Sequence, residues 1–169
     1  MPDHSHLSAQ HSADFTLNDW LAYIEALHPK DIEMGLARVE EVSQRLNLDI
    51  HFPIITVAGT NGKGSTCAML EHIYHAAGYR VGTYSSPHFL RYSERVRVAC
   101  QEITDVDLIA AFQAVEKARQ DTQLTYFEYG TLAAIWHFSR AGLDVLILEV
   151  GLGGRLDAVN VFEPSCAIV

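Results

Sequence analysis

The stretch Ile54-Ile55-Thr56-Val57-Ala58-Gly59-Thr60-Asn61-Gly62-Lys63-Gly64-Ser65 decides the fold that this sequence predicts. Its first five residues form a short β-branched apolar run, which is typical of a strand buried on both faces of a parallel sheet. A glycine-rich turn follows, and residues 65–77 then suit a helix that ends at Gly78. The stretch therefore predicts a strand, a tight turn and a helix in immediate succession.

The turn between this strand and this helix has the composition of a phosphate-binding loop. Glycines let backbone N–H groups approach phosphate oxygens, and the helix N-terminus adds partial positive charge. The Lys63 ammonium can reach terminal phosphates, although Gly64 separates it from Ser65, unlike in the G-x4-G-K-[ST] pattern. An ordinary glycine-rich turn is the alternative, but a lysine among three glycines is an unusual choice for one. The candidate ATP-binding residues are Gly59, Thr60, Asn61, Gly62, Lys63, Gly64 and Ser65.

Further strands and helices follow at the spacing of an α/β fold. A second strand over 80–84 completes a βαβ unit with parallel strands. Apolar strands are expected at 145–150 and from 166, and a half-exposed strand at 95–98. Helices are expected over 16–27, over 36–47, after Thr104, and from Thr125 or Tyr126 to Arg140, with a break at Pro29-Lys30-Asp31. The predicted fold class is α/β, with an open, mostly parallel sheet of the P-loop type flanked by helices.

Glu149 is a candidate metal ligand because it lies at the end of the apolar run 145–150. Ligands gather beyond the carboxyl ends of parallel strands, and carboxylate oxygens suit a Mg²⁺ ion that bridges ATP phosphates. A solvated glutamate is the alternative, and the glycine-rich turn at 151–154 weighs against it. The segment Ser85-Ser86-Pro87-His88 follows the second strand at the same edge, where a local turn is its simplest interpretation.

Several other polar residues have ordinary structural interpretations. Glu128, near a helix start, can simply complement the helix dipole. Arg91, Arg95 and Arg97 either attract an anionic substrate or pair with acidic side chains, and surface pairing is the commoner outcome. The histidines His72, His75 and His137 lie within predicted helices, where packing is the default.

Composition limits the classes of protein to which the chain can belong. With 12 Lys and Arg against 21 Asp and Glu, its formal net charge of -9 disfavours general nucleic-acid binding. The 169 residues, 49% of them hydrophobic, fit one folded domain. No apolar run approaches a membrane span, and no secretory signal pattern begins the chain. The three cysteines lie too far apart in sequence for a zinc knuckle or a CxxC pair, which indicates reduced thiols in the cytoplasm.

The two ends of the chain differ in character. Residues 1–14 predict a flexible leader, whose His4, His6 and His11 lack the preorganisation of a metal site. Residues 166–169 begin an apolar strand in which the chain stops. Because a parallel strand normally continues into a crossover helix, we expect the natural polypeptide to run on.

Three longer motifs occur in a fixed order: TVAGTNGKGS at 56–65, YSSPH at 84–88 with RYSER at 91–95, and LEVGLGGRLD at 148–157. Together they resemble the folylpolyglutamate synthase/dihydrofolate synthase family of the Mur ligase-like superfamily. The segment Ile32-Glu33-Met34-Gly35-Leu36 also looks like that family's opening region. The resemblance implies that residues 15–169 are the N-terminal part of a P-loop ATP-binding domain, with the C-terminal glutamate-binding domain absent.

The resemblance also implies an activity and the residues for it. The family's members use ATP and Mg²⁺ to join L-glutamate to dihydropteroate or folate through an acyl phosphate, and they are monomers. By this resemblance Lys63 and Glu149 are catalytic, the loop residues contact the ATP phosphates, and Ser86 and Glu149 hold magnesium. The dihydropteroate pocket would comprise Thr125, Tyr126, Phe127, Glu128, Leu156, Asp157 and Ala158, with the Phe127 ring available for stacking. A further metal-binding histidine, a modified lysine and the adenine contacts lie beyond Val169 in the family, so we expect no turnover from this chain alone.

Two other interpretations remain at this stage. An amide ligase of cell-wall precursor synthesis shares the Gly-Thr-Asn-Gly-Lys loop and also proceeds through an acyl phosphate, but Gly64 and the Ser85-Ser86-Pro87-His88 segment favour the folate enzyme. The second is a P-loop nucleotide-binding module without ligase chemistry, which would bind ATP but no pteroate.

Overall fold

A central sheet of six strands organises the computed structural model, which describes residues 14–27 and 35–169. The strand order is β4-β3-β2-β5-β1-β6. Strands β2 (Val81–Tyr84), β5 (Val145–Glu149), β1 (Ile54–Val57) and β6 (Cys166–Ile168) run parallel. Strand β3 (Val96–Val98) pairs antiparallel with β2, and β4 (Gln101–Glu102) pairs antiparallel with β3. The predicted open, mostly parallel sheet of an α/β fold is confirmed.

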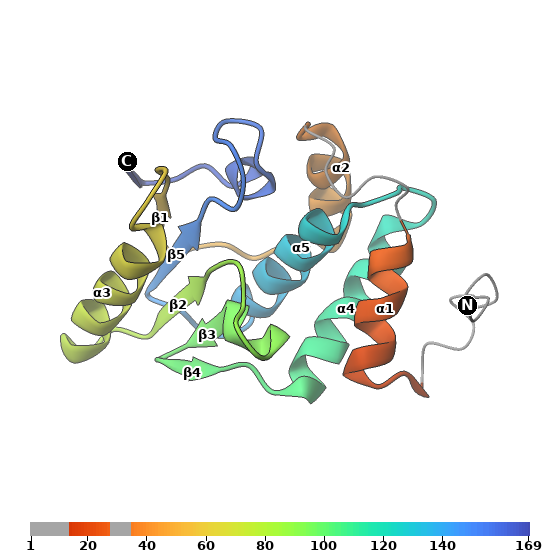
Figure 1. Ribbon diagram of the computed structural model, residues 1–169, viewed down its shortest axis with the longest axis horizontal. Coiled ribbons are helices and arrows are strands. Elements are labelled where there is room, and N and C mark those ends of the chain that lie inside the picture. Colours follow the sequence, from red (N-terminus) through yellow and green to blue (C-terminus); the bar gives the residue numbers. More distant parts are fainter. Residues whose placement is uncertain (1–13, 28–34) are drawn as a thin grey trace.

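Helices cover both faces of this sheet (Figure 1). On one face, Cys67 of α3 (Lys63–Ala76) packs in a cluster with Ile55, Val57 and Ile147 of the strands. On the other face, α5 (Tyr126–Phe138) packs with α4 (Asp105–Arg119), α1 (Leu17–Ala26) and α2 (Ala37–Leu46) around a larger core. Successive strand residues point to opposite faces, and helices cover both faces. Strands β1 and β5 are therefore buried along their whole length.

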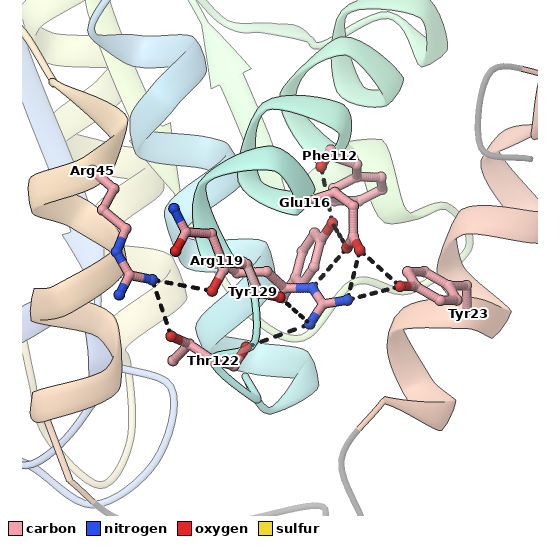
Figure 2. A network of polar contacts seen from close by, with 8 residues as sticks. Tyr23, Arg45, Phe112, Glu116, Arg119, Thr122 and Tyr129 are labelled. Carbon is pink, nitrogen blue, oxygen red and sulfur yellow. Dashed lines mark hydrogen bonds and ion pairs between the residues drawn. The ribbon is translucent and has the colours of Figure 1, made fainter. Parts of the chain in front are cut away.

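A network of partly buried polar side chains joins α1, α4 and α5 (Figure 2). The Glu116 carboxylate accepts hydrogen bonds from Tyr23 Oη at 2.8 Å and from Arg119 Nη2 at 2.6 Å. Tyr129 Oη donates to the Phe112 carbonyl at 2.9 Å and lies 3.1 Å from Glu116 Oε2. These contacts pair polar groups that would otherwise be costly to bury, and they fix α5, whose N-terminus reaches the candidate site.

Element boundaries differ from the sequence predictions where backbone conformation or tertiary contacts intervene. Helix α3 begins at Lys63 rather than at the predicted Ser65. Its N-cap is Gly62, which takes a left-handed φ of 78°. Arg95 does not start a half-exposed strand; it is buried and ends the 3-10 turn Tyr92–Arg95. Helix α5 ends at Phe138 rather than Arg140, and neither β4 nor the 3-10 turn Ala158–Val161 was predicted.

The remaining predicted helices and strands are present, within a residue or two of their predicted ends. The predictions for the leader histidines, for Pro29-Lys30-Asp31 and for residues 32–34 lie outside the described residues. None of the helices within 14–27 and 35–169 has the length and hydropathy needed to cross a bilayer.

Candidate functional site

The loop between β1 and α3 presents backbone and a lysine at the carboxyl edge of the sheet. Gly59 and Gly62 take φ values of 131° and 78°, which side-chain-bearing residues rarely adopt. Within the described part of the chain, no side chain caps the N-terminus of α3, so its first N–H groups are available to an anion. Lys63 Nζ donates to the Gly59 carbonyl at 3.0 Å, which holds the ammonium over the loop.

The Glu149 carboxylate lies directly against this loop. A Cβ built on Gly64 would be 3.8 Å from Glu149 Oε1 and 4.0 Å from Oε2, so the acid touches the first turn of α3. Ser86 N donates to Glu149 Oε2 at 3.0 Å. Burial raises the pKa of Glu149 above its usual 4.5, although the Ser86 hydrogen bond and the Lys63 charge partly oppose this shift. The fold thus brings the loop, Ser86 and Glu149 together, as the sequence predicts.

This arrangement fits a divalent cation. Glu149 is 4% exposed, and no ion pair reaches its carboxylate from any described residue. An isolated buried carboxylate is unfavourable unless a cation or a proton neutralises it. Carboxylate and hydroxyl oxygens are the ligands that Mg²⁺ prefers, and Glu149 and Ser86 supply both kinds at one edge of the sheet.

Phe127 adjoins the same edge. A Cβ on Gly151 would lie 2.6 Å from Phe127 Cζ and 3.2 Å from Ser86 Oγ, so only glycine lets the chain after β5 pass between them. The Phe127 ring also packs near the Tyr84 ring, with centroids 6.1 Å apart. An aromatic face therefore lies next to the candidate metal ligands.

Asp157 holds the segment that follows Gly151. Its Oδ2 accepts hydrogen bonds from Gly151 N at 3.0 Å and from Leu152 N at 2.8 Å, while Oδ1 accepts from Val159 N at 3.1 Å. Burial raises the pKa of Asp157 above its usual 3.8 despite these three donors. The side chain thus fixes the turn at 151–157 and the adjoining Ala158, whereas Leu156 is exposed.

Thr125 and Glu128 serve the helix on which Phe127 lies. They form a capping box in which Thr125 N donates to Glu128 Oε2 at 2.8 Å and Glu128 N to Thr125 Oγ1 at 3.3 Å. Glu128 Oε1 also accepts from Arg38 Nη2 at 2.8 Å. These contacts make Glu128 more than a partner of the helix dipole, since it joins α2 to α5.

The three arginines of the sequence analysis separate into two groups. Arg91 forms an ion pair with Glu102 at 2.8 Å on the surface, which is the common outcome for an arginine. Arg97 forms an ion pair with the buried Glu71 at 2.5 Å. Arg95 instead lies over two rings, 5.2 Å from the centroid of Tyr92 and 5.8 Å from that of Tyr126. From the sequence, only anion binding or ion pairing was expected for Arg95. These ring contacts were not predicted, because Tyr126 lies in a distant segment of the chain.

Replacing Asp157 by alanine is expected to lower the free energy of unfolding by about 1–3 kcal/mol, because three backbone donors lose a buried acceptor. Chemical denaturation measures the change. Asp121→Ala removes an exposed aspartate and is the matched control, expected within about 0.5 kcal/mol of the parent. Equal stability of the two variants would show that Asp157 does not hold the turn.

Comparisons with known proteins identify similar sequences. The chain is 57% identical over 154 residues to the dihydrofolate synthase/folylpolyglutamate synthase of Escherichia coli K12, covering 90% of the chain and 36% of that relative. It is 48% identical over 161 residues to the one of Haemophilus influenzae, covering 95% of the chain and 37% of the relative. The chain thus spans little more than a third of the length of these relatives. No family model matches it.

Solved structures give the same result for the fold. The chain matches E. coli FolC in complex with DHPP and ADP at a TM-score of 0.88 and 56% identity, covering 92% of this chain and 38% of that one. It matches the Yersinia pestis bifunctional folylpolyglutamate synthase/dihydrofolate synthase complexed with AMPPNP and Mn ion at 0.87 and 55%, covering 91% and 38%. The described fold is therefore that of the corresponding region in these enzymes.

Proposed function

Because this chain is homologous over nine-tenths of its length to the dihydrofolate synthase/folylpolyglutamate synthases, we propose that it supplies the ATP- and magnesium-binding part of such a ligase. The ligase adds L-glutamate to dihydropteroate, to folylpolyglutamate, or to both. The observation that carries this proposal is the buried Glu149 carboxylate against the first turn of α3, beside Lys63 and Ser86.

The proposed reaction has two steps. A carboxylate oxygen of the pteroyl substrate attacks the γ-phosphorus of ATP, and the bond to the β,γ-bridging oxygen breaks, which releases ADP and leaves an acyl phosphate. The glutamate amine then attacks the acyl carbon; an amide forms, phosphate leaves, and the amine loses a proton. The first step brings two anions together, so its barrier depends on positive charge held in place beforehand.

The residues of this chain answer that requirement. Lys63 and the free N–H groups of α3 bind the phosphate oxygens and stabilise the charge that develops on them. Glu149 and Ser86 would hold the Mg²⁺, which supplies charge neutralisation between the phosphates when bound. No nucleophilic side chain of the protein is required in either step.

We assign the pteroyl side of the site to the two segments that meet beyond β5. Phe127 offers its ring for stacking, and Tyr126, Leu156 and Ala158 lie on the same two segments. We assign a positioning role to Thr125, Glu128 and Asp157. Glu128 accepts hydrogen bonds from Thr125 N and from Arg38, and Asp157 accepts one from Gly151 N.

Because the relatives are much longer than this chain, we propose that it carries out only part of their reaction. We expect the 169-residue chain to bind nucleotide or pterin at most and to catalyse no turnover, because nearly two thirds of each relative has no counterpart in it. We further propose that the ligase acts as a monomer in the cytoplasm, a compartment in which free cysteines stay reduced.

The test is a chimera in which this chain replaces the matching residues of the E. coli relative. We expect the chimera to form ADP over many turnovers only when L-glutamate and either dihydropteroate or a folate are present, and the chain alone to sustain none. ADP formation with nucleotide-linked muramyl substrates instead would favour the cell-wall ligase. ATP binding by the chain, with no ligase activity in a folded chimera, would favour a nucleotide-binding module.

A further inference from the structure

A second cluster of metal-ligating side chains lies on α3, away from the phosphate loop. Glu71, His72 and Cys100 each place one ligand atom within 4.8 Å of those of the other two. Glu71 and His72 belong to α3, whereas Cys100 comes from the turn between β3 and β4. Glu71 is eight residues, or about 12 Å along the helix, from Lys63.

We propose that Glu71, His72 and Cys100 form a zinc site. The set offers a carboxylate oxygen, an imidazole nitrogen and a sulfur, and Zn²⁺ binds all three kinds of atom with tetrahedral geometry. His72 is exposed and Cys100 partly exposed, so water can reach a fourth position. Sequence spacing did not suggest such a site, because the fold brings together residues that are 28 positions apart.

Two of the three ligands are already oriented by other contacts. His72 Nδ1 lies 2.7 Å from the Ala68 carbonyl oxygen, which requires the proton on Nδ1 and leaves the lone pair on Nε2. Such a bond from the second ring nitrogen is characteristic of metal-bound histidines. Arg97 Nε and Nη2 donate to the two Glu71 oxygens at 3.2 and 2.5 Å, which fixes the carboxylate but leaves it further lone pairs.

The turn between β3 and β4 holds Cys100 beside α3. Ala99 and Cys100 take φ values of 50° and 63° in the turn between β3 and β4. Two successive left-handed residues in a two-residue hairpin turn favour Asn-Gly, so neither alanine nor cysteine serves the turn itself. The turn places the Cys100 ligand atom within 4.8 Å of those of Glu71 and His72.

The charge balance is compatible with a divalent ion. Burial and the nearby Glu71 carboxylate raise the pKa of Cys100, so the thiol is protonated without metal. On binding, its S–H proton passes to solvent, and the thiolate and the carboxylate then set two negative charges against those of the ion and of the Arg97 guanidinium. The Arg97 guanidinium adds a repulsive charge, which weakens the site but keeps its carboxylate in place.

The experiment uses the full chain with His4, His6 and His11 replaced by alanine, so that the leader histidines do not contribute. Co²⁺ serves as a spectroscopic probe, since a thiolate ligand produces a sulfur-to-cobalt charge-transfer band, and calorimetry measures Zn²⁺ affinity. We expect one Zn²⁺ per chain. We also expect Cys100→Ser to remove the band and Cys100→Ser or His72→Ala to weaken Zn²⁺ binding at least about 10- to 100-fold.

Cys166→Ser, which changes an exposed cysteine elsewhere, is the matched control and should retain the band. Circular dichroism establishes that each variant is folded; because His72 and Cys100 lie at the surface, we expect all of them to be. A charge-transfer band that survives Cys100→Ser, or Zn²⁺ affinity unchanged in both ligand variants, would overturn the proposal. Absence of any Zn²⁺ binding in the folded parent would do the same.

Discussion

Replacing Glu149 by glutamine is expected to stabilise the chain without metal and to weaken its metal-dependent binding of nucleotide. The carboxylate is 4% exposed and burial raises its pKa, so its charged form is costly in the folded state. Glutamine has nearly the same shape and can still accept the hydrogen bond from Ser86 N. The substitution therefore removes an unfavourable charge without creating a cavity.

The gain in stability has a defined pH dependence. A carboxyl whose pKa is raised by folding binds its proton more tightly in the folded than in the unfolded state. Well below pH 4.5 both states are protonated, and the variant and the parent should be equally stable. As the pH rises through 4.5 to the folded-state pKa, the parent loses stability relative to the variant, and the full difference is present at neutral pH.

Thermal unfolding in a chelator at acid and neutral pH measures this difference. Calorimetric titration with ADP, with and without Mg²⁺, measures the metal-dependent part of the affinity, which we expect to fall about 10- to 100-fold. Glu163→Gln removes an exposed carboxylate and is the matched control for both measurements. Metal-dependent binding that persists in Glu149→Gln would place the cation on other residues.

The sheet and the glycine-rich loop between β1 and α3 were predictable because their signals are local. A β-branched run followed by glycines requires only neighbouring residues to be recognised, and the apolar run before Glu149 is of the same kind. The start of α3 was placed two residues late, since the left-handed conformation of Gly62 is not readable from composition. The juxtaposition of Glu149 with Gly64 follows from the parallel pairing of β1 with β5, a strand order that the sequence analysis did not predict.

The contacts that join distant segments could not be predicted in the same way. Arg95 alternates with Val96 as a strand residue would, yet it packs on the rings of Tyr92 and Tyr126. Glu128 was expected to complement the dipole of its own helix, but nothing near it in sequence indicated the capping box with Thr125 or Arg38 as a partner. Such pairs depend on how helices pack together, which local periodicity does not specify.

Replacing Lys63 by alanine is expected to weaken ATP binding about 10- to 100-fold and to lower ligase turnover of the chimera by about 10²–10³-fold. The Lys63 ammonium is held over the loop by the Gly59 carbonyl at 3.0 Å, so it is positioned before the phosphate arrives. Its loss also removes the positive charge that partly opposes the raised pKa of Glu149. The first effect removes a positive charge from the phosphates, and the second favours the protonated form of Glu149, which holds a cation less well.

Calorimetry with ATP on the chain and ADP formation by the chimera measure the two effects separately. The matched control is Lys117→Ala, which removes the same charge from an exposed position of α4, outside the loop between β1 and α3. Because Lys63 is partly exposed and its ammonium contacts only a backbone carbonyl among the described residues, the free energy of unfolding should change by less than about 0.5 kcal/mol. A folded Lys63→Ala protein that binds ATP as tightly as Lys117→Ala would mean that the loop, despite its glycines and helix N-terminus, does not bind the triphosphate.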